Sequence, residues 1–189
     1  MVSITIFVAV MQRKGRLLQM EIEKKYLVKE LPELSQFKCH EIEQGYLTRK
    51  PTLRIRKKDD KYIFTYKSKI KGSPEDINVN DEVERPLTKE AYEKLREKTE
   101  GYLIHKTRYL IPIRAEYTER MEVFPDELTV ELDVFHGRLE GLVFAEIEFP
   151  SEAVAGHFLA PEWLGKDVSD DYRYRNGYLS EVEKYEMYE

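Results

Sequence analysis

The residues with the most chemical potential in this chain come in pairs that are two positions apart. Each pair has a single sign of charge and one residue between its members, as in "EIE" and "RIR". Arginine and lysine without histidine or cysteine suit phosphate oxygens, and carboxylates alone suit hard cations such as Mg²⁺ or Mn²⁺. A surface that offers both cationic side chains and carboxylates suits a metal-bound polyphosphate. The doublets are Glu21 and Glu23, Arg54 and Arg56, Lys67 and Lys69, Glu82 and Glu84, Lys106 and Arg108, Glu131 and Asp133, and Glu146 and Glu148.

The spacing of the doublets indicates β-strands, because side chains two apart share one face of a strand but diverge on a helix. At roughly 7 Å, two like charges repel by about 0.6 kcal/mol in water and about 2.4 kcal/mol at an effective dielectric of 20. One solvated sheet face would tolerate one such doublet. Seven of them favour an enclosed surface that faces a charged guest, with the intervening aliphatic residues pointing outward. A purely solvated face is the alternative.

The elements that must position these residues are antiparallel strands, which indicate a barrel or a sandwich. Helices are expected after Thr88, Ser151 and Ser180, each of which is a good N-cap residue. The expected strands span residues 20–28, 38–49, 52–58, 61–70, 77–86, 102–112, 128–136 and 142–149.

Composition places the chain among globular proteins of one domain. It has 189 residues, a net charge of −5 and 35% charged residues, which argues mildly against a nucleic-acid surface. A single cysteine, Cys39, excludes an intrachain disulfide and fits a cytoplasmic location. No apolar run approaches the ~18 residues of a membrane span. Residues 1–19 differ from the rest and are interpreted as an N-terminal extension, which leaves 20–189 as a single domain; an extra strand that pairs with a neighbour is the alternative.

Several short motifs occur in a characteristic order. They are "EIEKKYLV" (21–28), "QGYL" (44–47), "LRIR" (53–56), "TYKSK" (65–69), "EVERPL" (82–87), "KTRY" (106–109), "ELDVFHGRLEGLVFAEIEF" (131–149) and "WLGKDVSDDYRYRN" (163–176). This ordered set resembles the CYTH superfamily, the triphosphate tunnel metalloenzymes, and its ending resembles the bacterial inorganic triphosphatase branch. The resemblance implies a mainly β (α+β) fold: an eight-stranded antiparallel closed barrel, or tunnel, with flanking helices. It leaves the segment 110–130 as a longer loop or hairpin.

The resemblance also implies roles for individual residues. Lys25 matches the lysine on the transferred phosphate, and Glu23, Arg54 and Arg56 complete the catalytic set. The implied substrate-binding residues are Lys25, Arg54, Arg56, Lys67, Lys69, Lys106, Arg108 and Arg173. The implied metal ligands are Glu21, Glu23, Glu82, Glu84, Asp133, Glu146 and Glu148, for Mg²⁺ or Mn²⁺.

The function expected from these features is divalent-metal-dependent hydrolysis of inorganic triphosphate or of a triphosphate ester, such as thiamine triphosphate or a nucleoside triphosphate. One alternative is an adenylate cyclase of the CYTH type that makes cyclic AMP from ATP. Another is a non-catalytic module that binds polyphosphate. The expected partner is a small molecule that contains a triphosphate, without nucleic acid or membrane, and a homodimer remains open.

Overall fold

The computed structural model describes residues 11–13, 16–18, 22–69 and 80–186, and the side chains of residues 22–68 and 82–186. Its main element is a sheet of nine strands, in the order β13-β3-β11-β10-β8-β4-β5-β6-β7, in which every neighbouring pair is antiparallel. The strands are β3 (Ile22–Val28), β4 (Lys38–Arg49), β5 (Thr52–Lys58), β6 (Lys61–Lys69), β7 (Asn80–Leu87), β8 (Glu100–Arg114), β10 (Glu127–Phe135), β11 (Val143–Phe149) and β13 (Leu164–Asp167).

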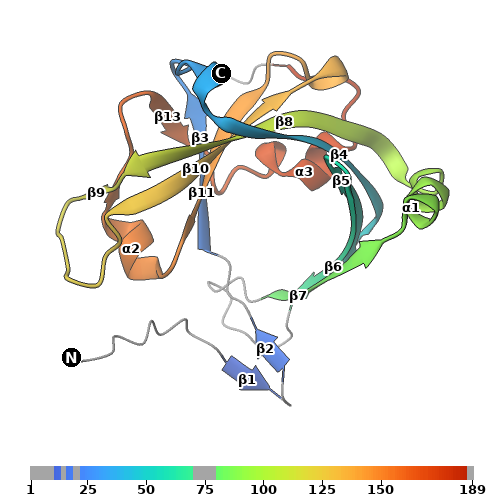
Figure 1. Cartoon of the computed structure of the whole chain (residues 1–189), viewed down its shortest axis with the longest axis horizontal. Helices are drawn as coiled ribbons and strands as arrows, with labels where there is room; N and C mark the ends of the chain where they lie inside the picture. Colours follow the sequence, from blue (N-terminus) through green and yellow to red (C-terminus); the bar gives the residue numbers. More distant parts are fainter. Residues whose placement is uncertain (1–10, 14–15, 19–21, 70–79, 187–189) are drawn as a thin grey trace.

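The prediction of a mainly β antiparallel fold with flanking helices is confirmed, but eight strands in a closed barrel is wrong for the part of the chain that is described. The sheet curves strongly on itself (Figure 1), yet its order ends at β13 and β7. β13 pairs with β3 at Val28 and Tyr26. It therefore occupies part of the edge of β3 that a closed eight-stranded barrel would offer to β7.

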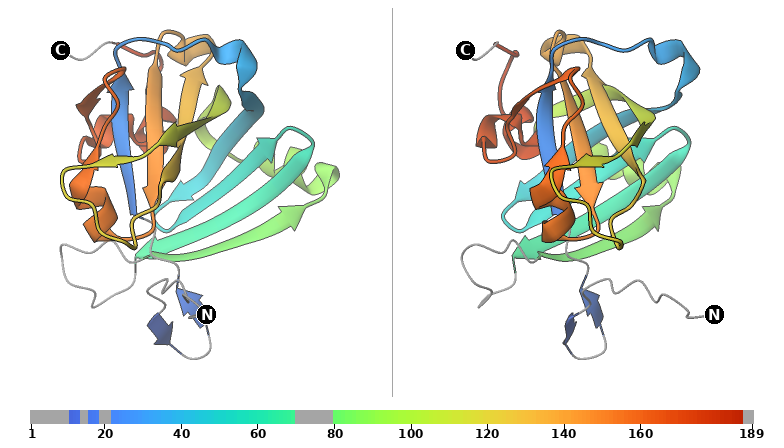
Figure 2. Two further views of the ribbon diagram at one scale, coloured as in Figure 1. Left: turned by 60° about the vertical axis from the view of Figure 1, so that its left-hand side comes forward. Right: turned by 90° about the vertical axis from the view of Figure 1, so that its left-hand side faces the viewer.

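The convex side of the sheet carries one apolar core. Leu132 and Ile147 are fully buried there, as expected for the aliphatic residues between charges. Figure 2 shows α2 (Glu152–His157) and the short pair of β9 (Glu116–Tyr117) with β12 (Phe158–Leu159) alongside these strands. Ser151 caps α2 as predicted, since its Oγ accepts a hydrogen bond from the Val154 amide at 3.3 Å.

A second apolar cluster lies at one end of the concave side. Phe135 and Phe144 lie in register with Lys106 and Asp133, so these aromatic rings share the concave face with charged residues. The C-terminal elements η3 (Tyr172–Tyr174) and α3 (Asn176–Leu179) cover this cluster, and Figure 1 shows α3 inside the curve of the sheet. The cluster comprises Tyr46, Ile104, Phe135, Leu139, Leu142, Phe144, Val168, Tyr174 and Leu179.

The remaining elements are smaller. α1 (Lys89–Arg96) packs on β5 and β6, and Thr88 caps it as predicted through a 3.2 Å hydrogen bond from the Ala91 amide. The helix expected after Ser180 is absent from the described residues, because Ser180 instead ends α3. η1 (Leu34–Gln36) and η2 (Gly137–Leu139) are single turns. No helix in the described ranges is both long and apolar enough to cross a membrane.

β1 (Met11–Arg13) and β2 (Arg16–Leu18) form a hairpin that is not a part of the nine-stranded sheet. The interpretation of residues 1–19 as an extension from one domain at 20–189 stays a prediction. The expected hairpin within 110–130 corresponds to the end of β8, then β9 and the start of β10, with β9 paired to β12.

Candidate active site

Strand alternation and register place the charged doublets on the concave face of the sheet. Lys25 of β3 lies opposite Glu146 of β11, and Glu146 lies opposite Glu131 of β10. Arg108 of β8 lies opposite Asp133. Directly opposed residues of an antiparallel pair point to the same face. We call the β3, β11, β10 and β8 part of this face, with Lys25, Glu146, Glu131, Asp133, Arg108 and Lys106, the first wall.

The first wall is a network of close ion pairs. The Lys25 ammonium lies 2.8 Å from Oε1 of Glu146 and donates a 2.9 Å hydrogen bond to the carbonyl of Tyr174. Its nitrogen also lies 4.5 Å from the centroid of the Phe144 ring. Lys25 is therefore the residue at which the charged network meets the apolar cluster that the C-terminal segment covers.

Arg108 is the centre of this network. Its guanidinium donates to both oxygens of Asp133, at 2.7 and 2.6 Å, and to Glu146 at 2.5 Å. It also donates to Glu131. These carboxylates raise the pKa of Arg108 above its ordinary value in spite of burial, which acts in the opposite direction. Arg108 thus stays charged at any physiological pH.

Glu146 is held as an anion although it is buried. Burial alone would raise its pKa, but the charges of Lys25, Arg108 and Lys106 outweigh burial and hold the pKa far below its ordinary value. Lys106 shows the reverse balance. Burial, together with the nearby charge of Arg108, lowers its pKa to about 8, and Asp133 and Glu146 only partly offset this change.

The opposite part of the concave face, on β5, β6 and β7, is more loosely paired. We call it the second wall, with Arg54, Arg56, Thr65, Lys67, Glu82 and Glu84. Lys67 and Glu82 lie 3.0 Å apart. Arg54 is 3.8 Å from Glu82 and 3.7 Å from Glu84, and Arg56 is 3.9 Å from Glu84. These last three distances are too long for hydrogen bonds, so the two arginines are paired by charge alone with these carboxylates.

Both arginines of the second wall have one N–H donor that no described residue accepts. The Nε atoms of Arg54 and Arg56 are buried and make no hydrogen bond within the described part of the chain. Burial lowers the pKa of Arg56 to about 10, and repulsion from Arg54 adds to this, so the guanidinium is still charged at neutral pH. Buried N–H groups are normally satisfied. These two donors therefore fit an anion that the two arginines would share.

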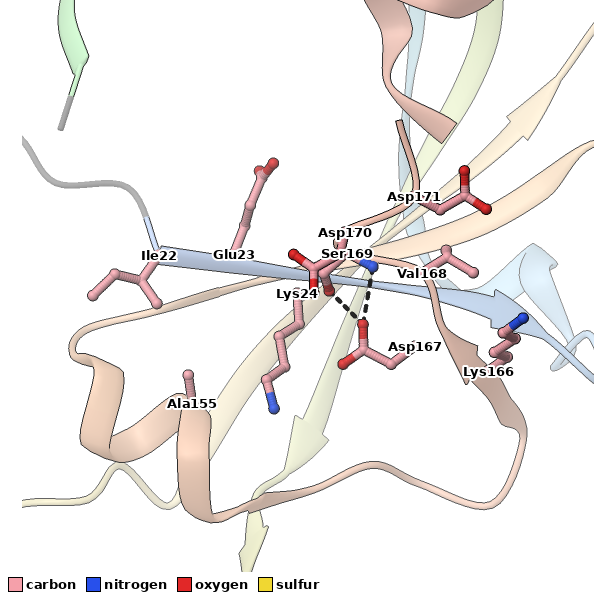
Figure 3. A pocket seen from close by; sticks show the side chains of 10 residues that line it. All are labelled: Ile22, Glu23, Lys24, Ala155, Lys166, Asp167, Val168, Ser169, Asp170 and Asp171. Atoms are coloured by element: carbon pink, nitrogen blue, oxygen red, sulfur yellow. Dashed lines mark hydrogen bonds between the residues drawn. The ribbon is translucent and has the colours of Figure 1, made fainter. Parts of the chain in front are cut away.

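Two carboxylates face each other across β3 and β11. Glu23 lies in register with Glu148, and both side chains are exposed. Figure 3 shows Glu23 on the opposite side of β3 from Lys24. Among the described residues, no group of three or more His, Cys, Asp or Glu side chains is close enough to hold a metal ion. The implied metal ligands thus stay a prediction, and Glu23, Glu84 and Glu148 are the exposed members of the set within the described residues.

Not every implied residue joins the two walls. Glu21 lies outside the described residues, and for Lys69 only the backbone, at the end of β6, is described. Arg173 lies on the C-terminal segment, where its guanidinium binds Asp171 at 2.5 and 2.9 Å. Asp171 also lines a hollow of about 610 Å³ that runs along the edge of β3, with Lys24, Lys166 and Asp167 (Figure 3). Glu23 also lines this hollow, and the ion pairs of the two walls lie outside it.

The charge pattern did not indicate three uncharged groups of the face. Thr65 accepts a 3.3 Å hydrogen bond from Arg54 and donates one of 3.0 Å to Glu84. Tyr46 is almost fully buried; burial raises the pKa of its phenol, and the charges of Arg54 and Arg56 oppose that shift. Gln44 donates to the Tyr46 hydroxyl at 3.4 Å. Their alternation with the doublets, at positions 44, 46 and 65, was the signal that could have found them.

Comparison with known proteins assigns the chain to a family. No protein-family model matches it. The chain is 35% identical over 164 residues to an inorganic triphosphatase of Nitrosomonas europaea, covering 85% of this chain and 96% of the relative. It is 35% identical over 162 residues to an inorganic triphosphatase of Acetivibrio thermocellus, covering 84% and 92%.

The structural comparison agrees. A crystal structure of an inorganic triphosphatase, 34% identical, matches with a TM-score of 0.63 and covers 87% of this chain and 96% of that one. The resemblance that the ordered motifs indicated is thereby confirmed. The chain belongs to the inorganic triphosphatase family.

Proposed function

We propose that this protein hydrolyses inorganic triphosphate on the concave face of its sheet, with Mg²⁺ or Mn²⁺ as the cofactor. The observation that carries the proposal is the pair of buried Nε donors on Arg54 and Arg56, which have no hydrogen-bond partner among the described residues and lie across from a wall that contains Lys25 and Arg108. A short polyanion would satisfy these donors. The two inorganic triphosphatases that cover nearly the same length support the same substrate.

Lys25 is the group best placed for the terminal phosphoryl group. It stands at the border of the apolar cluster, with Phe144 and the Tyr174 carbonyl beside its ammonium. A phosphate chain held at Lys25 can extend away from this cluster, toward the charged walls, but not through it. This arrangement favours a substrate that is recognised by its terminal phosphoryl group. Inorganic triphosphate has such a group and carries no organic group.

The carboxylates fit a hard divalent cation. Glu23 and Glu148 offer opposed oxygen ligands on the exposed part of the face. Mg²⁺ and Mn²⁺ accept oxygen ligands, and Mg²⁺ is typically held by one or two carboxylates, with substrate phosphates and water filling the other positions. A site of few protein ligands therefore agrees with this chemistry. The bound ion would neutralise charge on the phosphate oxygens.

The residues of the chain would act by positioning and by electrostatic stabilisation. Arg54 and Arg56 would bind oxygens along the triphosphate, and Lys25 would bind the terminal phosphoryl group, held in place by Glu146. Water attacks the terminal phosphorus in line, the bond to the bridging oxygen breaks, and orthophosphate and diphosphate leave. Positive side chains aimed at the phosphoryl oxygens stabilise the charge of the transition state.

A product assay tests the proposal. Purified protein is incubated with inorganic triphosphate, ATP or thiamine triphosphate, each with Mg²⁺, Mn²⁺ or a chelator, and orthophosphate, diphosphate and cyclic AMP are measured. We expect metal-dependent release of orthophosphate and diphosphate, fastest from inorganic triphosphate. Cyclic AMP with diphosphate from ATP would indicate the cyclase instead. Tight binding without any product would indicate a polyphosphate-binding module.

Cytoplasmic location and the absence of nucleic-acid and membrane partners are further parts of the proposal. They are supported by the single cysteine and the net charge of −5. A homodimer remains the alternative to a monomer.

A further inference from the structure

Asp133 differs from the other carboxylates of the site in being completely enclosed. Its exposure is 0%, whereas Glu23 and Glu148 are exposed. Both of its oxygens are occupied by cations. Oδ1 accepts from Nε of Arg108 at 2.7 Å, and Oδ2 accepts from the other end of the same guanidinium at 2.6 Å and from Lys106 at 2.5 Å. A metal ion would have to displace these bonds to reach it.

Lys106 is enclosed with it. The residue is 2% exposed, and its nitrogen lies 5.4 Å from the centroid of the Phe135 ring in the apolar cluster. Lys106 and Arg108 both donate to the Oδ2 atom of Asp133, so this carboxylate joins the two cations. The buried Lys106 ammonium thus holds the carboxylate in place, and it is too enclosed to contact a substrate on the exposed part of the face.

Arg108 is the member of this group that faces the site. Its side chain is 13% exposed, and it extends from Asp133 to Glu146 and Glu131. A two-pronged contact with one carboxylate fixes the plane of a guanidinium as well as its position. Asp133 grips Arg108 in this way, while Glu146 and Glu131 each take a single contact.

We propose that Asp133, secured by Lys106, is a positioning residue that fixes the guanidinium of Arg108 for the phosphate chain, and that it is not a metal ligand. This inference rests on the proposed function, since it takes the same concave face as the site. It assigns to Lys106 and Asp133 a joint role in place of separate contacts with substrate and metal. The metal then depends on the exposed carboxylates, Glu148 and Glu23 on one side of the face and Glu84 on the other.

Two binding measurements separate the roles without any need for turnover. Calorimetry gives the Kd of a slowly hydrolysed triphosphate analogue, and electron paramagnetic resonance gives the Kd of Mn²⁺ with each variant saturated by that analogue. We expect Asp133→Asn to weaken analogue binding tenfold or more and to change the Mn²⁺ Kd by less than about threefold. Glu148→Gln should show the opposite pattern, with Mn²⁺ binding weakened tenfold or more.

A double-mutant cycle tests whether Asp133 acts through Arg108. Adding Asp133→Asn to Arg108→Lys should cost little further affinity for the analogue, because the group that Asp133 positions is already changed. Adding it to Arg54→Lys should multiply the two losses. Equal loss of Mn²⁺ binding in Asp133→Asn and Glu148→Gln would overturn the proposal, and so would full multiplication with Arg108→Lys.

Folding is checked by circular dichroism for every variant. If Asp133→Asn does not fold, the double variant Lys106→Met/Asp133→Asn replaces it, since that variant removes both charges and leaves Arg108 with Glu146 and Glu131. The same two outcomes then decide. Failure of the proposed function is distinguishable, because a wild-type protein that binds the analogue but releases no phosphate would still give both Kd values.

Discussion

Lys25 and Glu146 form an ion pair of 2.8 Å across β3 and β11, and the next opposed pair on the same face is Glu23 with Glu148. Two adjacent positions of one strand pair therefore differ in kind. The first joins opposite charges in a buried place, and the second sets two carboxylates against each other in the open. Opposed like charges destabilise a strand pair. A cation bound there would reverse the effect.

This difference predicts unequal losses of stability for two isosteric substitutions. Glu146→Gln removes the anion between Lys25 and Arg108, so we expect a loss of about 1–3 kcal/mol in unfolding free energy, as for other buried partners that are removed. Glu148→Gln removes a charge from an exposed position opposite Glu23, so its Tm without metal should fall less than that of Glu146→Gln. Thermal denaturation in a chelator measures both. A larger Tm loss in Glu148→Gln than in Glu146→Gln would contradict the assignment.

The two substitutions should also differ in how their catalytic activity depends on metal concentration. Glu148→Gln should lower kcat/KM for triphosphate by tenfold or more at limiting metal and recover in part at high metal. The defect of Glu146→Gln should persist at high metal, because the position of Lys25 is lost. Glu97→Gln, on the exposed end of α1, is the control, and its kinetics should match the wild type.

Arg54→Lys keeps the charge of the second wall but removes the planar fork and the buried Nε donor. We expect kcat/KM for triphosphate to fall by about tenfold or more, since a hydrogen bond to a charged group contributes about 1.5–3 kcal/mol. Arg85→Lys is the matched control. Arg85 is exposed and follows Glu84 on β7, so its side chain points away from the concave face. Equal kinetics for the wild type and Arg54→Lys would place Arg54 outside the site.

Much of the sheet could be predicted, because its strands carry the signal themselves. Each of the eight expected strands exists in the described residues, and the expected positions 20, 21, 70 and 77–79 lie outside them. The single-sign doublets indicated both the period and the face of seven of these strands. β13 was missed. Its sequence, "LGKD", lacks alternation, and it forms by pairing with β3, far away in sequence. Pairing of this kind leaves no local trace.

The candidate site, too, could be predicted only in part. Charge type and parity indicated which residues share the concave face, but not how deeply each lies. Asp133 and Glu148 look alike in the sequence, yet one is enclosed and the other exposed. Asp133 is bound by Lys106 and Arg108 and lies opposite Phe144, in the apolar cluster that Tyr174 and Leu179 join from the C-terminal segment. The expected helix after Ser180 failed for a related reason, because Ser180 binds Arg49 at 2.9 Å and ends α3.

The pKa of Lys106 gives a pH prediction with a definite sign. Burial lowers this pKa to about 8 in the folded protein, against roughly 10.4 for an unfolded chain. Between these values the unfolded chain binds a proton that the folded protein does not, so this residue makes stability rise with pH over that interval. Lys106→Met lacks the titrating group. The difference in Tm, wild type minus Lys106→Met, should therefore increase between pH 7 and pH 10. A constant or shrinking difference would refute the lowered pKa.

The last prediction tests the opposed walls without catalysis. If a triphosphate relieves the repulsion stored among like charges, it should stabilise the folded protein far more than salt does. A ligand at about 100 times its Kd adds about 2.7 kcal/mol, and each kcal/mol shifts Tm by about 2–4 °C for a chain of this size. A slowly hydrolysed triphosphate analogue with Mg²⁺ or Mn²⁺ should thus raise Tm by roughly 5–10 °C.

Orthophosphate at equal ionic strength should raise Tm much less, because it cannot reach from Lys25 to the arginines of the second wall at once. In Arg54→Lys the analogue should lose part of its effect, whereas in Arg85→Lys the effect should be complete. A merely solvated charged face predicts screening alone, which is equal for any salt of the same ionic strength. If sodium chloride reproduced the whole shift, the doublets would be surface charges and the concave face would not be the triphosphate site.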